Sequence, residues 1–329
     1  MSKILYWKEL LFGRSDTLRG SVLFACNDDA VEFLATHYDE LREHYILDTM
    51  AQDVHLAMLN KARTLELAAS LGIGTPKFWY VRHSEDLTTI LSETTFPVII
   101  KPIHSHLFLK QFKNTKYFSA ANENELTHWL EICRQKNVDV IISEWIPGPD
   151  HLLCSYFTYI TESGEPLFHY TKRVIRRFPA NAGLACLHVT EWIPEVADLG
   201  WKFFSGVKYR GLGNIEFKRD LRDGKLKVIE CNPRFAAPQE LITQSGLNIP
   251  IIIYNHLIGL PLPESNLYTE HMHMWYPVRD IRAFLELHRR KEITLKEWLK
   301  SIPLHHVLPY FRIDDPLPSL SILFHVFNK

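Results

Sequence analysis

The segment Gly213–Phe235, G-N-I-E-F-K-R-D-L-R-D-G-K-L-K-V-I-E-C-N-P-R-F, decides the fold of this chain. Its two strand-like runs, at 214–218 and 225–231, flank the dipeptide D-G at 223–224. An Asp-Gly pair between two such runs is a strong signal for a β-hairpin, because both residues tolerate the positive φ angles of a tight turn. We therefore predict two antiparallel strands joined at this turn.

Two glutamates occupy equivalent places in this hairpin. If the strands pair about the turn, the side chains of Glu216 and Glu230 project from one face, and Asn232, two residues further on, has the same phase. Two carboxylates and an amide oxygen are hard oxygen ligands suited to Mg²⁺, and facing carboxylates repel unless a cation stabilises them. Asp220 is the alternative ligand if the register differs. On residue types alone, an exposed hairpin with ordinary surface glutamates explains the pattern equally well.

The composition excludes several classes of protein. The 329 residues are 46% hydrophobic and 23% charged, with a formal net charge of −1, so no overall field favours nucleic acid or an anionic membrane. The five cysteines are scattered without a C-x-x-C pair, which predicts reduced thiols and a cytoplasmic location. No apolar run approaches the roughly 20 residues of a spanning helix, and the first apolar run is too short for a signal peptide. We expect a soluble protein.

The order of the predicted elements indicates an α+β fold. Strand–helix units give way to a series of antiparallel hairpins, an order that does not suit a doubly wound parallel sheet. The predicted strands cover 22–26, 96–101, 138–145, 153–160 and 166–178, in addition to the hairpin already described. The main predicted helices cover 51–71, 123–136 and 238–257.

The run I-E-C-N-P-R-F at 229–235 resembles the Glu-x-Asn-x-Arg motif that ends a core strand in the ATP-grasp superfamily. The resemblance implies an ATP-grasp fold, in which two α+β subdomains clasp ATP. It also implies that Glu216, Glu230 and Asn232 hold two Mg²⁺ ions. The run G-L-G-N-I-E at 211–216 resembles the D-alanine–D-alanine ligases as well, but those enzymes carry a basic residue where Asn214 stands, so that substrate contact is not carried over.

Two lysines match the phosphate-binding positions of the family. Lys101 ends the run F-P-V-I-I-K, similar to the family's V-x-x-K-P strand, and Lys61 heads a helix in a segment that resembles the family's stretch from D-K to G-x-P-x-P. A compact ammonium group suits the α- and β-phosphates of ATP. An isolated lysine is better explained as a solvated surface residue, whereas both matches together predict phosphate binding.

The run I-I-S-E-W-I-P-G-P-D at 141–150 resembles the ATP-grasp hinge. That resemblance implies that backbone groups near Glu144 and Ile146 bind the adenine edge and that Asp150 takes the ribose hydroxyls. A buried strand ending in a Pro-Gly turn explains most of the same residues. It does not explain why such a strand lies between the lysines and the metal motif, in the order of the family.

The segment after Lys101 departs from the family pattern. It is usually glycine-rich, whereas P-I-H-S-H-L-F-L-K-Q-F-K-N-T-K at 102–116 contains no glycine. Either side chains replace the backbone amides that close over the phosphates in the family, or phosphate closure is impaired. The candidate side chains of this phosphate loop are His104, Ser105, His106, Lys113 and Lys116.

Several arginines are candidates for binding the transferred phosphate or a substrate carboxylate. Strand alternation places Arg173 and Arg177 on one face of their strand and Arg176 on the other. A guanidinium group on the ATP side can clamp a carboxylate bidentately, and an exposed basic strand is an equally good explanation. Arg177 and Arg234, which lies inside the N-P-R motif, are the catalytic candidates. Ala182-Gly183 are expected in a loop over the site.

Within the superfamily the chain resembles the D-aspartate ligase-like, carboxylate–amine ligase branch, over about residues 22–260. The resemblance implies transfer of the γ-phosphoryl group of ATP to a carboxylate, then attack of an amine on the acyl phosphate to form an amide. ATP and Mg²⁺ are the implied cofactors, and a small-molecule carboxylate and an amine the implied partners, with a homodimer left open. Two alternatives stay open: an ATP-binding regulatory or scaffold protein that has lost catalysis, and phosphoryl transfer to a non-carboxylate acceptor.

The same resemblance divides the chain into four segments. A pre-ATP-grasp segment, shorter than is usual in the branch, covers 1–60, and the small subdomain with the phosphate loop covers 61–145. The large subdomain with the metal site covers 146–260, and a helical C-terminal extension covers 261–329.

Overall fold

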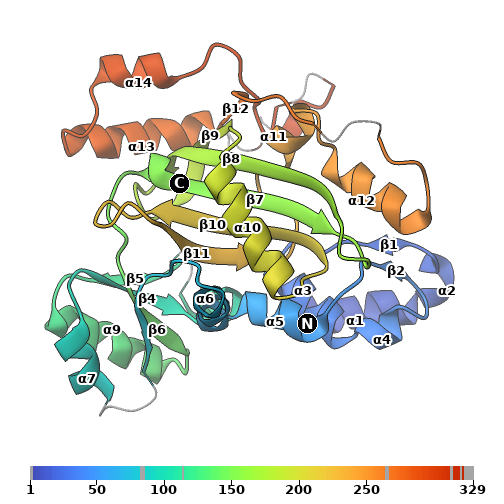
Figure 1. The fold of residues 1–329 in the computed structure, drawn as a ribbon, viewed down its shortest axis with the longest axis horizontal. Helices are drawn as coiled ribbons and strands as arrows, with labels where there is room; N and C mark the ends of the chain where they lie inside the picture. Colours follow the sequence, from blue (N-terminus) through green and yellow to red (C-terminus); the bar gives the residue numbers. More distant parts are fainter. Residues whose placement is uncertain are drawn as a thin grey trace.

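The computed structural model describes residues 3–81, 86–112, 115–263, 267–311, 314–318 and 321, and within them the chain forms three sheets (Figure 1). The largest is a six-stranded antiparallel sheet in the order β11-β10-β7-β8-β9-β12. Its strands are β7 (Leu153–Ile160), β8 (Pro166–Phe178), β9 (Leu184–Thr190), β10 (Gly211–Arg219), β11 (Leu226–Asn232) and β12 (His273–Trp275). The predicted bounds of β7 and β8 are confirmed.

Helix α10 (Pro194–Gly206) packs across one face of this sheet, which the figure shows in front of the strands (Figure 1). The helix approaches β7 so closely that a Cβ atom on Gly200 would lie 2.3 Å from the ring of Tyr156. Only glycine permits that approach. Phe203 and Phe204 of the helix are fully buried against the sheet, in the main hydrophobic core.

A four-stranded antiparallel sheet forms a separate layer at lower left in Figure 1, in the order β3-β6-β4-β5. The strands are β3 (Phe78–Tyr80), β4 (Val98–Pro102), β5 (Phe118–Ala120) and β6 (Val140–Glu144), and the helices of this layer are α7 (Asp86–Glu93), α8 (Ser105–Gln111) and α9 (Glu123–Gln135). Helix α9 begins after the N-cap Asn122, whose side chain accepts a hydrogen bond from the backbone N–H of Glu125.

The N-terminal part of the chain contributes two short parallel strands and several helices. These are α1 (Lys3–Gly13), α2 (Ser15–Leu18), β1 (Val22–Leu23), α3 (Asp28–Thr36), α4 (Tyr38–Leu41), β2 (Ile46–Leu47), α5 (Gln52–Leu59) and α6 (Lys61–Ser70). The single helix predicted over 51–71 is wrong, because the chain is extended at Asn60. The Asn60 side chain caps α6 by accepting from the N–H of Arg63, and Lys61 becomes the first residue of that helix.

The C-terminal part packs against the large sheet: the segment 239–258 packs with residues of β7 and β10, and the segment 277–289 contacts β8 and β9. The helix predicted over 238–257 is two helices separated at 245–248. The helices of this part are α11 (Gln239–Gln244), α12 (Ile249–Ile258), α13 (Pro277–Arg289) and α14 (Leu295–Ser301). A 3-10 turn, Asp150–Leu152, lies earlier in the chain, between β6 and β7. Helix α13 is held by a buried carboxylate: Asp280 accepts hydrogen bonds from Arg176 at 2.7 and 3.0 Å, and from the indole N–H groups of Trp275 and Trp298 at 3.0 and 2.9 Å.

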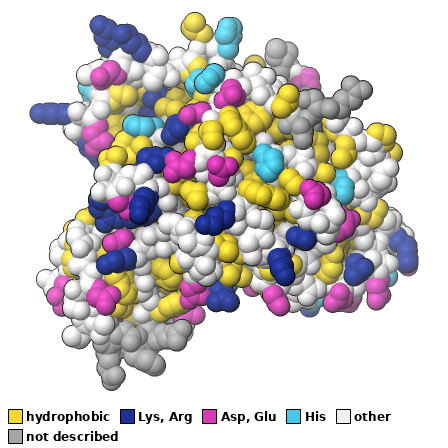
Figure 2. Space-filling view, in the orientation of Figure 1, with side chains coloured by type: hydrophobic (Ala, Val, Ile, Leu, Met, Phe, Trp, Pro, Cys, Tyr) yellow, Lys and Arg dark blue, Asp and Glu magenta, His cyan; other side chains and the backbone are white. Residues whose placement is uncertain are grey.

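The predicted α+β fold is confirmed, since both larger sheets are antiparallel and carry helices. Figure 2 shows basic and acidic side chains interspersed over the face seen in Figure 1, with hydrophobic side chains gathered near its centre. No helix in the described part of the chain is long and apolar enough to cross a membrane.

Candidate active site

A cleft of about 470 Å³ opens between the four-stranded and the six-stranded sheet. Its walls carry most of the residues that the sequence singled out. The predicted residues on its lining are Lys61, Lys101, Glu144, Ile146, Arg177, Glu216, Glu230, Asn232 and Arg234. They come from β4, β6, β8, β10 and β11, the start of α6, and the connections that follow β6 and β11. The fold therefore brings residues from far apart in the sequence into one cavity.

The two hairpin glutamates face each other as predicted. Glu216 of β10 and Glu230 of β11 are direct cross-strand partners, and Asn214 pairs with Asn232. Burial, and then the charge of Glu230, raise the pKa of Glu216. The charge of Lys61, whose Nζ lies 2.9 Å from Glu230 Oε2, holds the pKa of Glu230 below its usual range, although burial opposes this. One carboxylate of the pair is thus neutralised by a lysine and the other is not.

Asn232 and Arg234 extend this cluster toward the N-terminal part. Asn232 Oδ1 accepts a hydrogen bond from Arg234 at 3.1 Å, and Arg234 Nε donates to Asp28 Oδ1 at 2.5 Å. Asp28, the first residue of α3, also lines the cleft. The sequence analysis did not select Asp28, and only its acidic position at a helix start could have drawn attention to it.

The donor set fits Mg²⁺. Glu216, Glu230 and Asn232 supply two carboxylates and an amide oxygen from neighbouring positions on one sheet face, which is the chemistry that Mg²⁺ prefers. The raised pKa of Glu216 reports a buried carboxylate that lacks a neutralising cation of its own. Among the described residues no group of three or more His, Cys, Asp or Glu side chains is arranged to hold a metal.

Lys101 comes from β4 of the small sheet, whereas Lys61, at the start of α6, reaches Glu230 on the large sheet. Burial, and then the charge of Lys61, lower the pKa of Lys101 to about 8, while Glu230 opposes the shift. For Lys61, burial acts to lower the pKa, but the charges of Glu230, Asp28 and Glu216 outweigh it and the pKa is raised. Two neighbouring lysines in a buried cleft are a costly arrangement that an anion relieves.

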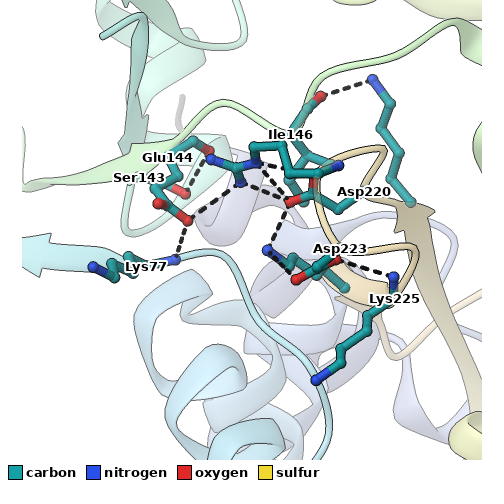
Figure 3. A network of polar contacts seen from close by, with 10 residues as sticks. Lys77, Ser143, Glu144, Ile146, Asp220, Asp223 and Lys225 are labelled. Atoms are coloured by element: carbon teal, nitrogen blue, oxygen red, sulfur yellow. Dashed lines mark hydrogen bonds and ion pairs between the residues drawn. The ribbon is translucent and has the colours of Figure 1, made fainter. Parts of the chain in front are cut away.

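The hinge segment is tied to the β10–β11 turn by a polar network (Figure 3). Lys218 Nζ donates to the carbonyl oxygens of Ile146 and Gly148 at 2.9 and 2.7 Å. The Glu144 carboxylate accepts from the N–H of Lys77 at 2.9 Å, and the Arg222 guanidinium lies 3.5 Å from it. A carbonyl has two lone pairs, so Ile146 can still accept from an adenine amino group.

Asp220 belongs to the same network and is not a metal ligand (Figure 3). Its carboxylate is fully buried and accepts from Arg222 at 2.6 Å and from Lys227 at 2.6 Å, and it does not line the cleft. The alternative ligand considered for a different hairpin register is therefore excluded, because the register has paired Glu216 with Glu230.

Asp150 lies behind the cleft wall instead of on it. Its buried carboxylate accepts from Arg177 Nε at 2.7 Å, from the Arg177 N–H at 3.0 Å and from the Asn181 N–H at 3.1 Å. With these partners, Asp150 orients Arg177 toward the cleft. These partners occupy the carboxylate that was expected to bind the ribose hydroxyls, so the geometry disfavours that contact.

The prediction for the three arginines of β8 is wrong in one respect: Arg173 and Arg177 do not share a face of the strand. Arg177 lines the cleft, whereas Arg173 pairs with Glu191 at 2.6 Å outside it. Strand β8 carries an extra residue between Val174 and Arg176, opposite Leu187 and His188 of β9, and this bulge interrupts the simple alternation. Arg176 lies on the face opposite Arg177, as predicted, and forms an ion pair with Asp280.

The glycine-free segment after Lys101 is largely helical. Ser105–Gln111 forms α8, and Phe108 is fully buried, in ring contact with Phe112 and Phe118. The expected phosphate loop is a helix at these residues, and the aromatic side chains pack this helix against the small sheet. Ser105 and Lys116 line the cleft, Lys113 lies outside the described residues, and the position of the His106 side chain is not described.

The loop between β8 and β9 forms another wall. Ala182 and Gly183 line the cleft, in agreement with a loop over the site. A Cβ atom on Gly183 would lie 1.8 Å from the carbonyl oxygen of Phe178, so the turn needs glycine. The buried Oδ1 of Asn181, which also lines the cleft, has no hydrogen-bond partner among the described residues.

The sequence analysis missed a group of basic and aromatic residues at the end of the cleft away from the hinge. They come from β8, β9 and the segment after β12. Their spacing carries no motif, and the C-terminal ones lie outside the stretch on which the family resemblance rests. These residues are Lys172, His188, Tyr276, Arg279 and Tyr310.

No protein-family model matches the chain. Individual proteins and solved structures do match it. The chain is 25% identical over 297 residues to D-aspartate ligase of Enterococcus faecium, covering 84% of this chain and 69% of that protein. It is 26% identical over 179 residues to a D-alanine–D-alanine ligase of Pseudomonas fluorescens, covering 53% of each chain. Its fold is similar to the biotin carboxylase domain of Hydrogenobacter thermophilus 2-oxoglutarate carboxylase, solved with MgADP and bicarbonate. That match has a TM-score of 0.65 and 16% identity, and covers 82% of this chain and 60% of the other.

Proposed function

Because this chain is an ATP-grasp protein of the D-aspartate ligase-like branch, we propose that it is a Mg²⁺-dependent ligase that activates a small-molecule carboxylate with ATP and joins it to an amine. The similarity to two kinds of ligase supports the general reaction. The single observation that carries the proposal is the facing pair Glu216 and Glu230, in a cleft that Lys61 and Lys101 also line.

We assign different roles to different residues of the cleft. Lys61 and Lys101 would bind phosphate oxygens of ATP and neutralise their charge. Glu216, Glu230 and Asn232 would hold Mg²⁺, which when bound offsets charge on the β- and γ-phosphates. Arg234, oriented by Asp28, and Arg177, oriented by Asp150, present guanidinium groups to the cleft and can bind the substrate carboxylate or the phosphoryl group that it receives.

The reaction then needs no nucleophilic side chain. A carboxylate oxygen of the substrate attacks the γ-phosphorus as the bond to ADP breaks, which gives an acyl phosphate and ADP. The nitrogen of the amine attacks the acyl carbon, phosphate departs, and a proton leaves the nitrogen. Positioning and charge stabilisation by the lysines and arginines are sufficient for both steps.

A coupled assay for ADP and phosphate release tests the proposal. Release should require both an acid and an amine, and Glu230→Gln should abolish it at saturating Mg²⁺ while the fold is kept, because one charge of the metal site is removed. Glu123→Gln, on the exposed start of α9, is the matched control and should turn over normally. ADP release that needs no amine would indicate phosphoryl transfer, and ATP binding without any release would indicate a regulatory protein.

A further inference from the structure

Helix α12 carries apolar side chains on both its inner and its outer face. Its sequence, I-P-I-I-I-Y-N-H-L-I, lies within the segment 241–263, which contains no Asp, Glu, Lys or Arg. A helix that is hydrophobic all round is usually buried, because a surface helix carries charged and polar residues on its outer face. Helix α12 instead lies at the surface, on the right in Figure 1, so its own chain covers only one side of it.

The inner face of α12 is fixed to the large sheet. Ile249, Ile252 and Ile253 are 0%, 4% and 1% exposed, and they pack in a core cluster with aromatic residues of β7 and β8. His256 lies on the same side of the helix, and its Nε2 is 3.2 Å from Glu162 Oε2. The helix is therefore held firmly from one side.

The outer face continues into the connection that follows the helix. Ile251 and Tyr254, one turn apart, are 48% and 40% exposed, and Leu260 and Leu262 are 50% and 42% exposed. A large side chain has on the order of 150–200 Å² of surface, so these four expose roughly 300 Å² together. We call them the α12 patch. An exposed apolar patch of this size is often a site of interaction.

Hydrogen bonds hold the two halves of the α12 patch against each other. Gly259 ends the helix with a φ of +73°, and the N–H of Leu260 then donates to the carbonyl of Asn255 at 2.8 Å. The Asn255 side chain donates to the carbonyl of Pro261 at 2.9 Å. The connection is thus turned back onto the helix, and a preformed surface of this kind binds a partner at a lower entropic cost.

Other exposed apolar side chains of the C-terminal part stand beside charged ones. Ile281 of α13 is 45% exposed and is followed by the exposed Arg282, and Leu299 of α14 is 56% exposed and is followed by the exposed Lys300. Single apolar side chains among charges are ordinary protein surface. The α12 patch differs from these places because no charged residue interrupts it.

We propose that the α12 patch is the contact surface between two copies of this chain, related by a two-fold axis. In such an interface the same surface meets itself, so a charge near the axis faces a like charge. A patch without charges avoids that repulsion, and homodimer interfaces are more apolar than other interfaces. The patch offers no charge to pair with a charged protein partner, and no Lys or Arg to hold an anionic membrane surface.

A second copy on this patch leaves the cleft open. Between Pro238 and Tyr276, none of the residues that the structure describes lines the cleft. Both copies of the dimer could therefore bind ligands at the same time. The inference does not depend on the ligase reaction, and it can be tested without substrate.

Sedimentation velocity from about 1 to about 100 µM protein, a range that covers reversible dimers, tests the proposal. The wild type should sediment with twice the mass of the chain. Ile251→Lys should raise the dissociation constant of the dimer at least about 30-fold, because a central apolar contact is lost and a charge meets its own copy. Ile281→Lys makes the same change at a similarly exposed isoleucine of another helix. It is the matched control and should leave the dissociation constant unchanged.

A second variant and a vesicle assay make the outcome decisive. Leu260→Lys should weaken the dimer as Ile251→Lys does, and both variants should keep the wild-type circular dichroism, since the replaced side chains are outside the core. The wild type should not float with phosphatidylcholine vesicles, with or without phosphatidylglycerol. A wild type that stays monomeric throughout the range, or a dimer that survives in both variants, would overturn the proposal. Flotation of the wild type that Ile251→Lys abolishes would assign the patch to a membrane and overturn it as well.

Discussion

Replacing Lys101 with methionine should stabilise the ATP-free protein while removing much of its affinity for ATP. Burial, and then the charge of Lys61, lower the pKa of Lys101 from 10.5 to about 8. The folded state therefore disfavours the charged lysine. At about 1.4 kcal/mol per pH unit, the full cost is about 3 kcal/mol. Because the side chain keeps some exposure, we expect Lys101→Met to gain about 2 kcal/mol at pH 7.

The lowered pKa of Lys101 also fixes how the free energy of unfolding should change with pH. Below pH 8, Lys101 is charged in both the folded and unfolded chain, so its cost to folding is fully present. Between about 8 and 10.5 the folded chain carries a neutral lysine and the unfolded chain a charged one, so stability rises with pH. The advantage of Lys101→Met over the wild type should therefore be largest at pH 7 and shrink toward pH 10.

Urea unfolding at pH 7 and pH 10 measures the effect, with Lys136→Met, at an exposed lysine after α9, as the control. Calorimetric titration with ATP should show binding at least about tenfold weaker in Lys101→Met, and a smaller loss in Lys116→Met, because Lys101 is fixed by a core strand. A Lys101→Met variant that is less stable than the wild type at pH 7 would refute the reasoning. Equal losses of ATP affinity in Lys101→Met and Lys116→Met would show that Lys101 is not the more important of the two lysines.

Three further substitutions test other parts of the structure. Asp220→Ala should cost about 2–4 kcal/mol in urea unfolding at pH 7, because two cations lose a buried carboxylate, and the difference should decline below about pH 4 as the carboxylate becomes protonated; an unchanged midpoint would contradict the network. Asp280→Ala should cost about 3–5 kcal/mol and shift tryptophan fluorescence to the red, since Arg176 and two indoles lose their acceptor; a variant with wild-type melting and emission would mean that α13 is held in another way. Glu216→Gln should stop ADP release without lowering the melting temperature, because burial already disfavours its charge; retained turnover would remove Glu216 from the metal site.

The hairpin and its glutamates could be predicted because local chemistry determines them. An Asp-Gly turn joins the two strands, and a β-bulge between Val228 and Glu230 then brings Glu216 opposite Glu230. The bounds of β7 and β8 followed from continuous strand-like runs for the same reason. Lys61 and Lys101 followed from motifs, and the structure puts both on the cleft.

The remaining features depend on long-range packing that no local pattern encodes. The break at Asn60 interrupts a sequence with sustained helical periodicity, and α8 forms because Phe108 finds Phe112 and Phe118 to pack against. The family resemblance predicts a ribose contact for Asp150, but its carboxylate, in a 3-10 turn, accepts from Arg177 of β8, 27 residues further along the chain. Arg279 reaches the cleft only because α13 docks on β8 and β9.

The bulge in β8 has a consequence for how relatives of this protein should be compared. One additional residue after Val174 sets which of two adjacent arginines faces which side of the sheet: Arg177 faces the cleft, and Arg176 holds the C-terminal helix. In a relative that lacks this residue, strand alternation would exchange the two sides, so the first arginine would point into the cleft and the second toward the helix. An alignment that misplaces a gap of one position at this strand would therefore confuse the cleft arginine with the arginine that anchors the helix.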